Sequence, residues 1–160
     1  METTNLITLA EITADTVRSV CGLDVAAEQR GYVAPNAISL AEANFNPGAW
    51  FRAVCLDGKP VGFVMLRDPS LPGAEPKGLA TDEIGLWRLM IDYRYQRRGY
   101  GRHALDLVRA TISGRRQFRR IVSSYIPGPH GPEAFYLEYG FSRTGGLRNN
   151  DREIEIALEL

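Results

Sequence analysis

Apolar and polar positions alternate with two different periods along this chain, and the two periods predict a mixture of strands and helices. Strand-like stretches are expected at residues 5–13, in both arms of 50–68, and at 83–92, 119–126 and 153–160. Helical stretches are expected at residues 14–21, 36–45, 101–113, 132–140 and, for a short piece, around Glu28. This order, with a hairpin before a central strand, favours an α/β fold whose sheet has mixed strand directions.

Turn-forming residues separate these stretches. Asp57-Gly58 lies between two apolar arms and is typical of a hairpin turn. Pro132 suits the first turn of the last helix and Gly140 suits its end. In the last strand, alternation places four apolar side chains on one face. They are Ile154, Ile156, Leu158 and Leu160.

The composition is that of an ordinary folded domain. The 160 residues, 44% of them hydrophobic and 24% charged, fit a single domain spanning 1–160. No long uncharged apolar stretch is present, so we expect no signal peptide, no membrane partner and a cytoplasmic location. Cys21 and Cys55 lie outside any metal-binding spacing and the chain has two histidines, so we expect no metal site.

The net charge is zero, but the charges are unevenly distributed. Residues 94–120 hold nine arginines and one acid, whereas residues 1–58 hold seven acids and three bases. This asymmetry predicts a polyanionic ligand at the middle of the chain and a cationic one elsewhere. A basic run is by itself weak evidence for nucleic acid, and the acids of the C-terminal segment argue against a general nucleic-acid surface, so we expect no nucleic-acid partner.

The middle of the chain contains the sequence QRRGYG at 96–101, between the apolar run 83–92 and a helical pattern. A strand that enters a glycine turn and then a helix exposes unpaired N–H groups, which bind anions. The string of a nucleotide P-loop is absent. The dinucleotide fingerprint is matched only weakly, because a basic segment stands where its ribose-binding acid belongs.

A third pattern for this turn, Q/R-x-x-G-x-G/A, fits QRRGYG in full. Together with VGFVML upstream and FYLEYGFSRTG at 135–145, it resembles the Gcn5-related N-acetyltransferase (GNAT) superfamily over residues 5–160. GLWRLMIDYRYQRRGYG and AEQRGYVAPN are similar to bacterial diamine and polyamine (spermine/spermidine) acetyltransferases. The resemblance implies one N-acetyltransferase domain with a mixed central sheet, flanked by helices and splayed to bind acetyl-CoA.

The resemblance also implies which residues bind acetyl-CoA, the co-substrate. The pantetheine arm would lie along the central strand, which matches Leu89, Met90 and Ile91. The diphosphate would meet backbone N–H groups of the turn, which match Arg97, Arg98, Gly99, Tyr100, Gly101 and Arg102. Where many relatives carry a coenzyme-binding Asn, this sequence has Pro129, a departure that leaves the role of His130 open.

For catalysis, the resemblance assigns Tyr136 as the general acid that protonates the leaving thiolate; packing in the core is the alternative. Glu83 is the candidate base, because strict alternation along the strand puts it on the same face as Ile91; a solvated acid at the strand end is the alternative. Glu28, Tyr32 and Glu42 are candidates to bind a cationic amine.

The predicted function is therefore transfer of an acetyl group from acetyl-CoA to a primary amine of a small cationic acceptor, such as a diamine or polyamine. The amine would attack the thioester directly in a ternary complex. Two alternatives stay open, a peptide or protein N-terminal acetyltransferase and a non-catalytic CoA-binding module. The resemblance also allows a homodimer.

Overall fold

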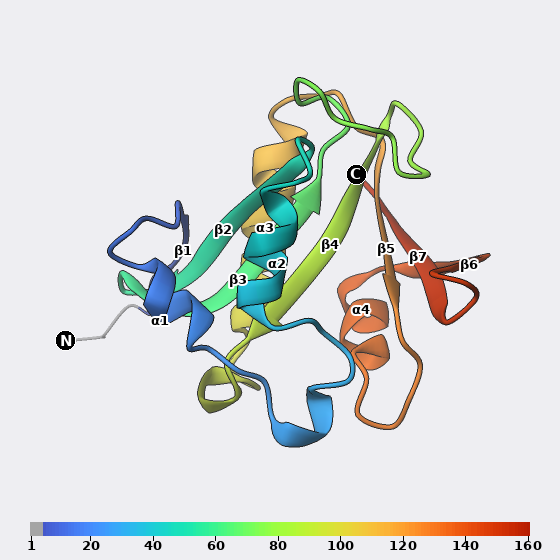
Figure 1. Ribbon diagram of the computed structural model, residues 1–160. Helices are drawn as coiled ribbons and strands as arrows, with labels where there is room; N and C mark the ends of the chain where they lie inside the picture. Colours follow the sequence, from blue (N-terminus) through green and yellow to red (C-terminus); the bar gives the residue numbers. More distant parts are fainter. Residues whose placement is uncertain (1–4) are drawn as a thin grey trace.

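The computed structural model describes residues 5–160, which build one seven-stranded sheet with helices on both faces (Figure 1). The strand order is β1-β2-β3-β4-β5-β7-β6, and only β4 and β5 run parallel. The strands are β1 (Ile7–Ala10), β2 (Ala49–Leu56), β3 (Lys59–Arg67), β4 (Glu83–Ile91), β5 (Arg120–Tyr125), β6 (Ser142–Arg148) and β7 (Glu153–Glu159). The helices are α1 (Val17–Cys21), α2 (Asn36–Ala43), α3 (Tyr100–Ser113) and α4 (Glu133–Tyr139), with short 3-10 turns η1 (Ala27–Gln29) and η2 (Tyr93–Tyr95).

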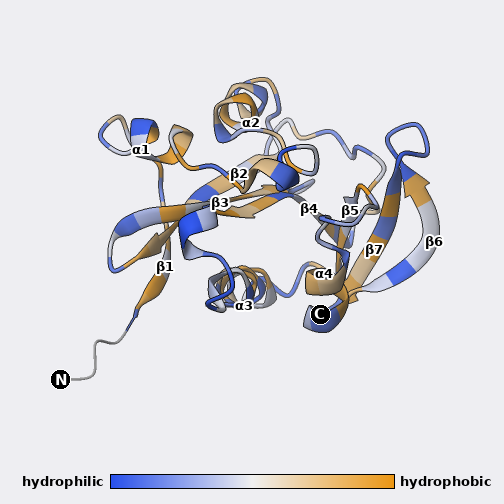
Figure 2. Cartoon of the chain, turned by 90° about the horizontal axis from the view of Figure 1, so that it is seen from below, coloured by the Kyte–Doolittle hydropathy of each residue, from blue (hydrophilic) through white to orange (hydrophobic). Residues whose placement is uncertain are grey.

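Alternating side chains of the strands fill two cores, one on each face of the sheet. Helices α1 and α2 cover one face and helices α3 and α4 cover the other (Figure 2). On β3, Phe63 and Met65 pack with Val20 of α1, whereas Val64 and Leu66 face the core that α3 and α4 cover. Helix α3 contributes its apolar stripe to that second core. The stripe consists of Ala104, Leu105, Val108 and Ile112. Among residues 5–160, no helix is long and apolar enough to cross a membrane.

Turn chemistry explains where several elements begin and end. Asp57 and Gly58 both have left-handed backbone angles (φ 48° and 83°), as a tight hairpin turn between β2 and β3 requires. Pro132 precedes α4 and Gly140 ends it with φ 123°. The α/β fold with a mixed sheet, expected from the sequence, is confirmed.

The structure contains one strand that the sequence pattern did not predict. Strand β6, SRTGGLR, pairs only with β7 and is the edge of the sheet. Most of its side chains are exposed, so it has no apolar alternation to reveal it. Its pairing partner β7 does show the alternation, and Ile154, Ile156 and Leu158 enter the core, whereas Leu160 stays exposed beyond the strand.

Strands β4 and β5 pair over only three residues each and then separate. The paired segments are 83–85 on β4 and 120–122 on β5. The Ser123 hydroxyl donates a hydrogen bond of 2.9 Å to the carbonyl of Leu86, at the point where the strands diverge. Residues 86–91 of β4 therefore have no strand partner on this side, and the sheet is splayed as the GNAT resemblance implies.

A β-bulge interrupts β4 at the same place. Arg88 lies opposite Met65 and Leu86 lies opposite Leu66, so Trp87 is an extra residue without a partner. Leu86 faces the α3 core, Trp87 packs with the α1/α2 core, and Leu89 faces the α3 core again. The bulge shifts the alternation by one residue, so the strict alternation that placed Glu83 on the face of Ile91 does not hold.

Candidate active site

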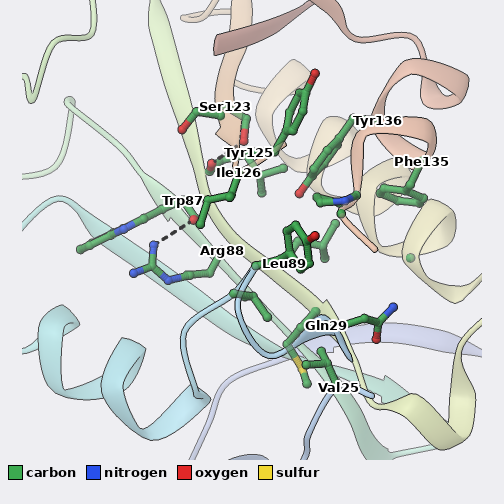
Figure 3. A pocket seen from close by; sticks show the side chains of 18 of the residues that line it. Val25, Gln29, Trp87, Arg88, Leu89, Ser123, Tyr125, Ile126, Phe135 and Tyr136 are labelled. Atoms are coloured by element: carbon green, nitrogen blue, oxygen red, sulfur yellow. Dashed lines mark hydrogen bonds between the residues drawn. The ribbon is translucent and has the colours of Figure 1, made fainter. Parts of the chain in front are cut away.

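A cavity of about 1130 Å³ lies between β4 and β5, where the sheet splays. Its walls come from β4, the turn before α3, β5, α4, and the segments 29–35 and 148–149. Figure 3 shows Tyr136 and Phe135 on one side of the cavity and Trp87 and Arg88 on the other. The cavity therefore joins the predicted anion-binding turn to the predicted general acid.

The turn before α3 presents a row of backbone donors without partners. None of the N–H groups of residues 97–102 donates a hydrogen bond to another described residue, and the first bonded one is that of His103, to the carbonyl of Gly99 at 3.0 Å. Arg97 and Gly99 both have left-handed backbone angles (φ 61° and 83°), and both residues line the cavity. Such a cradle fits a diphosphate, which supplies several acceptor oxygens.

Two glutamines and a glycine hold this turn in place. The side chain of Gln96 donates hydrogen bonds of 2.9 Å to the Ile91 carbonyl and to Gln29, so β4, the turn and η1 are joined. A Cβ at Gly101 would lie 3.3 Å from the ring of Phe135, so a larger residue would fit poorly at this position. The start of α3 thus packs closely against α4, as the second glycine of QRRGYG allows.

The structure places eight of the nine residues expected to bind the coenzyme in the cavity wall. Leu89, Met90 and Ile91 line it from β4, and Arg97, Gly99, Tyr100, Gly101 and Arg102 line it from the turn and the start of α3. Arg98 is the exception, since its side chain lies over Tyr95, 5.9 Å from the ring centre. The turn and the open edge of β4 together fit the diphosphate and pantetheine of acetyl-CoA.

Tyr136 lines the cavity from α4, with 7% of its surface exposed. Its ring contacts Phe135 and Phe141 edge-on, at centre distances of 5.3 and 5.4 Å. The hydroxyl makes no hydrogen bond with another described residue and points into the cavity (Figure 3). Burial raises the pKa of Tyr136 above its ordinary value, so the group is a proton donor at neutral pH.

Glu83 lies outside the cavity, at the end of β4 where the strands are paired. Its carboxylate binds the Arg120 guanidinium at 2.7 Å and accepts the N–H of Ala80 at 3.0 Å. Burial opposes ionisation, but these bonds outweigh it and lower the pKa of Glu83. The placement is that of a structural ion pair that ties β4 to β5, and it does not favour the base role expected of Glu83.

The three residues expected to bind the acceptor have different surroundings. Glu28 is exposed on η1 and is absent from the cavity wall. Tyr32 lines the cavity, and its hydroxyl lies against the loop between β5 and α4, where it accepts the N–H of His130 at 3.4 Å. Glu42 of α2 also lines the cavity, but it faces Arg88 at 3.6 Å.

Sequence reasoning missed several charged residues at the end of the cavity away from the turn. Arg67, Arg88, Arg148 and Glu153 line it there, from β3, β4, β6 and β7. Glu153 accepts a hydrogen bond of 2.6 Å from the Ser124 hydroxyl. One signal was available, because Arg88 interrupts the apolar run of β4; the other three are far apart in the sequence and carry no local pattern.

Comparison with known families decides what kind of fold holds this cavity. The family model "Acetyltransferase (GNAT) family" matches residues 17–141. The chain belongs to this family. It is therefore an acetyl-CoA-dependent N-acetyltransferase of the GNAT type, and the family resemblance read from QRRGYG and FYLEYGFSRTG is confirmed. No curated protein sequence matches the chain.

Solved structures with the same fold have diverse names. A GNAT family acetyltransferase from Elizabethkingia anophelis with acetyl-CoA bound is 14% identical, with a TM-score of 0.63. The match covers 96% of this chain and 98% of the other chain. The ribosomal-protein-S18-alanine N-acetyltransferase from Escherichia coli is 19% identical (96% and 94% covered, TM-score 0.65). An aminoglycoside 6'-acetyltransferase type Ii is 17% identical (96% and 96% covered, TM-score 0.67). At these identities the likeness shows the fold of the GNAT acetyltransferase and leaves its acceptor open.

Proposed function

We propose that this GNAT acetyltransferase moves the acetyl group of acetyl-CoA to a primary amine by direct attack within a ternary complex. The observation that carries the proposal is the row of unpaired N–H groups at 97–102, which opens into the same cavity as the Tyr136 hydroxyl. The diphosphate lies on the turn, and the pantetheine runs along residues 89–91 of β4. The thioester then reaches the divergence of β4 and β5 beside Tyr136.

In the reaction, the amine nitrogen bonds to the thioester carbon and the carbon–sulfur bond breaks. The thiolate takes its proton from the Tyr136 hydroxyl, which burial keeps protonated, and the second proton lost by the acetylated nitrogen restores that hydroxyl. The ammonium group of the acceptor must lose a proton before it attacks. Glu153 suits this role better than Glu83, because it lines the cavity and is oriented by the Ser124 hydroxyl.

The acceptor is a small molecule. Tyr32 lies against the loop that carries Gly128 and His130, and the Arg148 guanidinium reaches the carbonyl of Gly78 at 3.5 Å. These two contacts each bridge segments at the edge of the cavity, which disfavours the extended peptide of the alternative function. The diamine or polyamine class stays a prediction; its support is Glu42 and Tyr32 in the cavity wall, and Glu28 does not contribute.

Tyr136→Phe tests the mechanism. We expect kcat to fall about 100-fold with the KM values of both substrates nearly unchanged, since only the proton donor is lost. Release of the CoA thiol, followed with a colour reagent, measures the rate. In the wild type, the raised pKa of Tyr136 should keep kcat from falling as the pH rises past the ordinary tyrosine pKa of about 10.

Tyr139→Phe is the matched control for this test, because that hydroxyl is on the same helix but donates to Asp106 at 2.7 Å. It should leave kcat within about threefold of the wild type. An unchanged kcat in Tyr136→Phe would remove Tyr136 from the mechanism. If the protein bound acetyl-CoA but released no CoA thiol with any amine, the result would support a CoA-binding module in place of an enzyme.

A further inference from the structure

Three arginines gather at the end of the cavity farthest from the diphosphate turn. Arg67 ends β3, Arg88 lies in the bulged part of β4, and Arg148 ends β6. All three line the cavity, together with Lys77. Four acids lie near these cations: Glu155 binds Arg148 at 2.6 Å, Glu75 binds Lys77 at 2.9 Å, and Glu42 and Glu153 line the wall. Arg67 and Arg88 are therefore the cations here without a close counterion.

The guanidinium groups of Arg67 and Arg88 have few partners. Arg67 lies on the indole ring of Trp87, 4.0 Å from its centre, and makes no ion pair or hydrogen bond with another described residue. Arg88 bonds the carbonyl of Trp87 at 3.2 Å, but its buried Nε has no partner and Glu42 is 3.6 Å away. Burial lowers the pKa of both groups, and for Arg67 the charges of Arg88 and Arg148 add to the effect. An anion at this place would supply the missing acceptor oxygens.

The coenzyme phosphates are too far away to fill this role. Arg67 lies beside Gly85 in the sheet, whereas the turn follows Ile91. Six residues of strand separate these positions, a length of about 20 Å. A diphosphate on the turn therefore does not reach Arg67, which lies where β4 and β5 begin to diverge.

We propose that the acceptor carries a carboxylate as well as its amine, and that Arg67 and Arg88 bind this carboxylate. The inference rests on the proposed function, narrows its acceptor from primary amines in general to small amino-carboxylates, and stands against the diamine or polyamine prediction. Fork-shaped guanidinium groups suit a carboxylate, which can accept two parallel hydrogen bonds. A polyamine would bring further cations to the same place, and like charges repel.

Matched acceptor pairs test this proposal. 4-Aminobutyrate and putrescine have the same carbon chain but end in a carboxylate and an ammonium, and each α-amino acid can be compared with its amide. With the wild-type enzyme we expect at least one amino-carboxylate to exceed its partner about 100-fold in kcat/KM. Arg67→Gln and Arg88→Gln should each raise the KM for that acceptor about tenfold, with kcat and the KM for acetyl-CoA nearly unchanged.

Arg52→Gln is the matched control for Arg88→Gln. Arg52 also bonds the carbonyl of the preceding residue (2.7 Å), lies over a tryptophan (4.4 Å) and faces a loose carboxylate (3.8 Å), but it is outside the cavity. Its variant should keep the wild-type KM for every acceptor.

Two results would overturn the proposal. One is a preference for putrescine, spermidine or a peptide over all amino-carboxylates; the other is no turnover of any amino-carboxylate by an enzyme that binds acetyl-CoA in calorimetry. Failure to bind acetyl-CoA at all is a different result, because it removes the proposed function and this inference together.

Discussion

The two ends of the active-site cavity both present arginine side chains, but they are built in different ways. The end that we propose for the diphosphate is one continuous segment, residues 96–102, whose backbone donors and arginines come from the same turn. The acceptor end is assembled from β3, β4, β6, β7 and α2, and its charge comes from side chains alone. Backbone groups can bind a ligand common to many relatives, because most substitutions preserve them. A particular acceptor is selected by side chains, which substitutions alter.

This contrast explains why one end could be predicted from the sequence and the other could not. QRRGYG carries its own evidence, since the glycines, the arginines and the strand–turn–helix order are adjacent. Arg67, Trp87 and Arg148 become neighbours only when β3, β4 and β6 have been placed in the sheet. The residues expected at the acceptor end, Glu28, Tyr32 and Glu42, come from the acidic N-terminal segment, whose charge predicts a cationic ligand and not an anionic one.

The largest expected effect is at the continuous end. Gly99→Val places a branched side chain at φ 83°, where glycine alone is unstrained, so the row of N–H groups can no longer adopt its present direction. We expect acetyl-CoA binding, measured by calorimetry, to weaken about 100-fold or more, because several charge-assisted bonds are lost together.

Gly58→Val provides the control for Gly99→Val. Gly58 has the same φ of 83° and equally open surroundings, but it lies in the β2–β3 hairpin away from the cavity. That variant should lose stability and retain acetyl-CoA affinity. Equal loss of affinity in both variants would mean that backbone strain, and not the position of the amides, determines binding.

Most of the fold could be predicted, because its elements depend on local patterns. The hairpin at Asp57-Gly58, the stripe of α3 and the alternation of β7 all follow from neighbouring residues. Strand β6 could not be predicted, since an exposed edge strand has no apolar face. The bulge at Trp87 could not be predicted for a related reason. It is a feature of the pairing between β4 and β3, and the periodicity of β4 alone does not reveal it.

A smaller effect is expected in the segment where β4 and β5 are still paired, just before the two strands diverge to form the cavity. Glu83→Gln weakens the ion pair with Arg120, so we expect the free energy of unfolding to fall by about 1.5 kcal/mol in urea denaturation. Because the pKa of Glu83 in the folded protein is lowered, its contribution is present above the ordinary value of 4.5 and disappears as the pH falls below it. The wild type and the variant should therefore approach equal stability in acid.

Asp82→Asn is the comparison variant for Glu83→Gln. Asp82 binds Arg119 at 3.0 Å, but its side chain is about half exposed, so the loss of stability should be clearly smaller. In Glu83→Gln the folded enzyme should keep its kcat. A large fall in kcat with unchanged stability would instead identify Glu83, and not Glu153, as the base.

The smallest expected effect is at the closure of the acceptor end. A Cβ on Gly128 would lie 2.1 Å from the Tyr32 hydroxyl, so Gly128→Ala must push Tyr32 away from the β5–α4 loop. We expect the KM for the acceptor to rise about threefold, the equivalent of one weak hydrogen bond, while the KM for acetyl-CoA stays constant. Gly31→Ala, in the loop that carries Tyr32, meets no atom within 4 Å and should change neither value. If Gly128→Ala weakened acetyl-CoA as much as the acceptor, the loop would serve both ends of the cavity, and the separation between a fixed coenzyme end and an adaptable acceptor end would not hold.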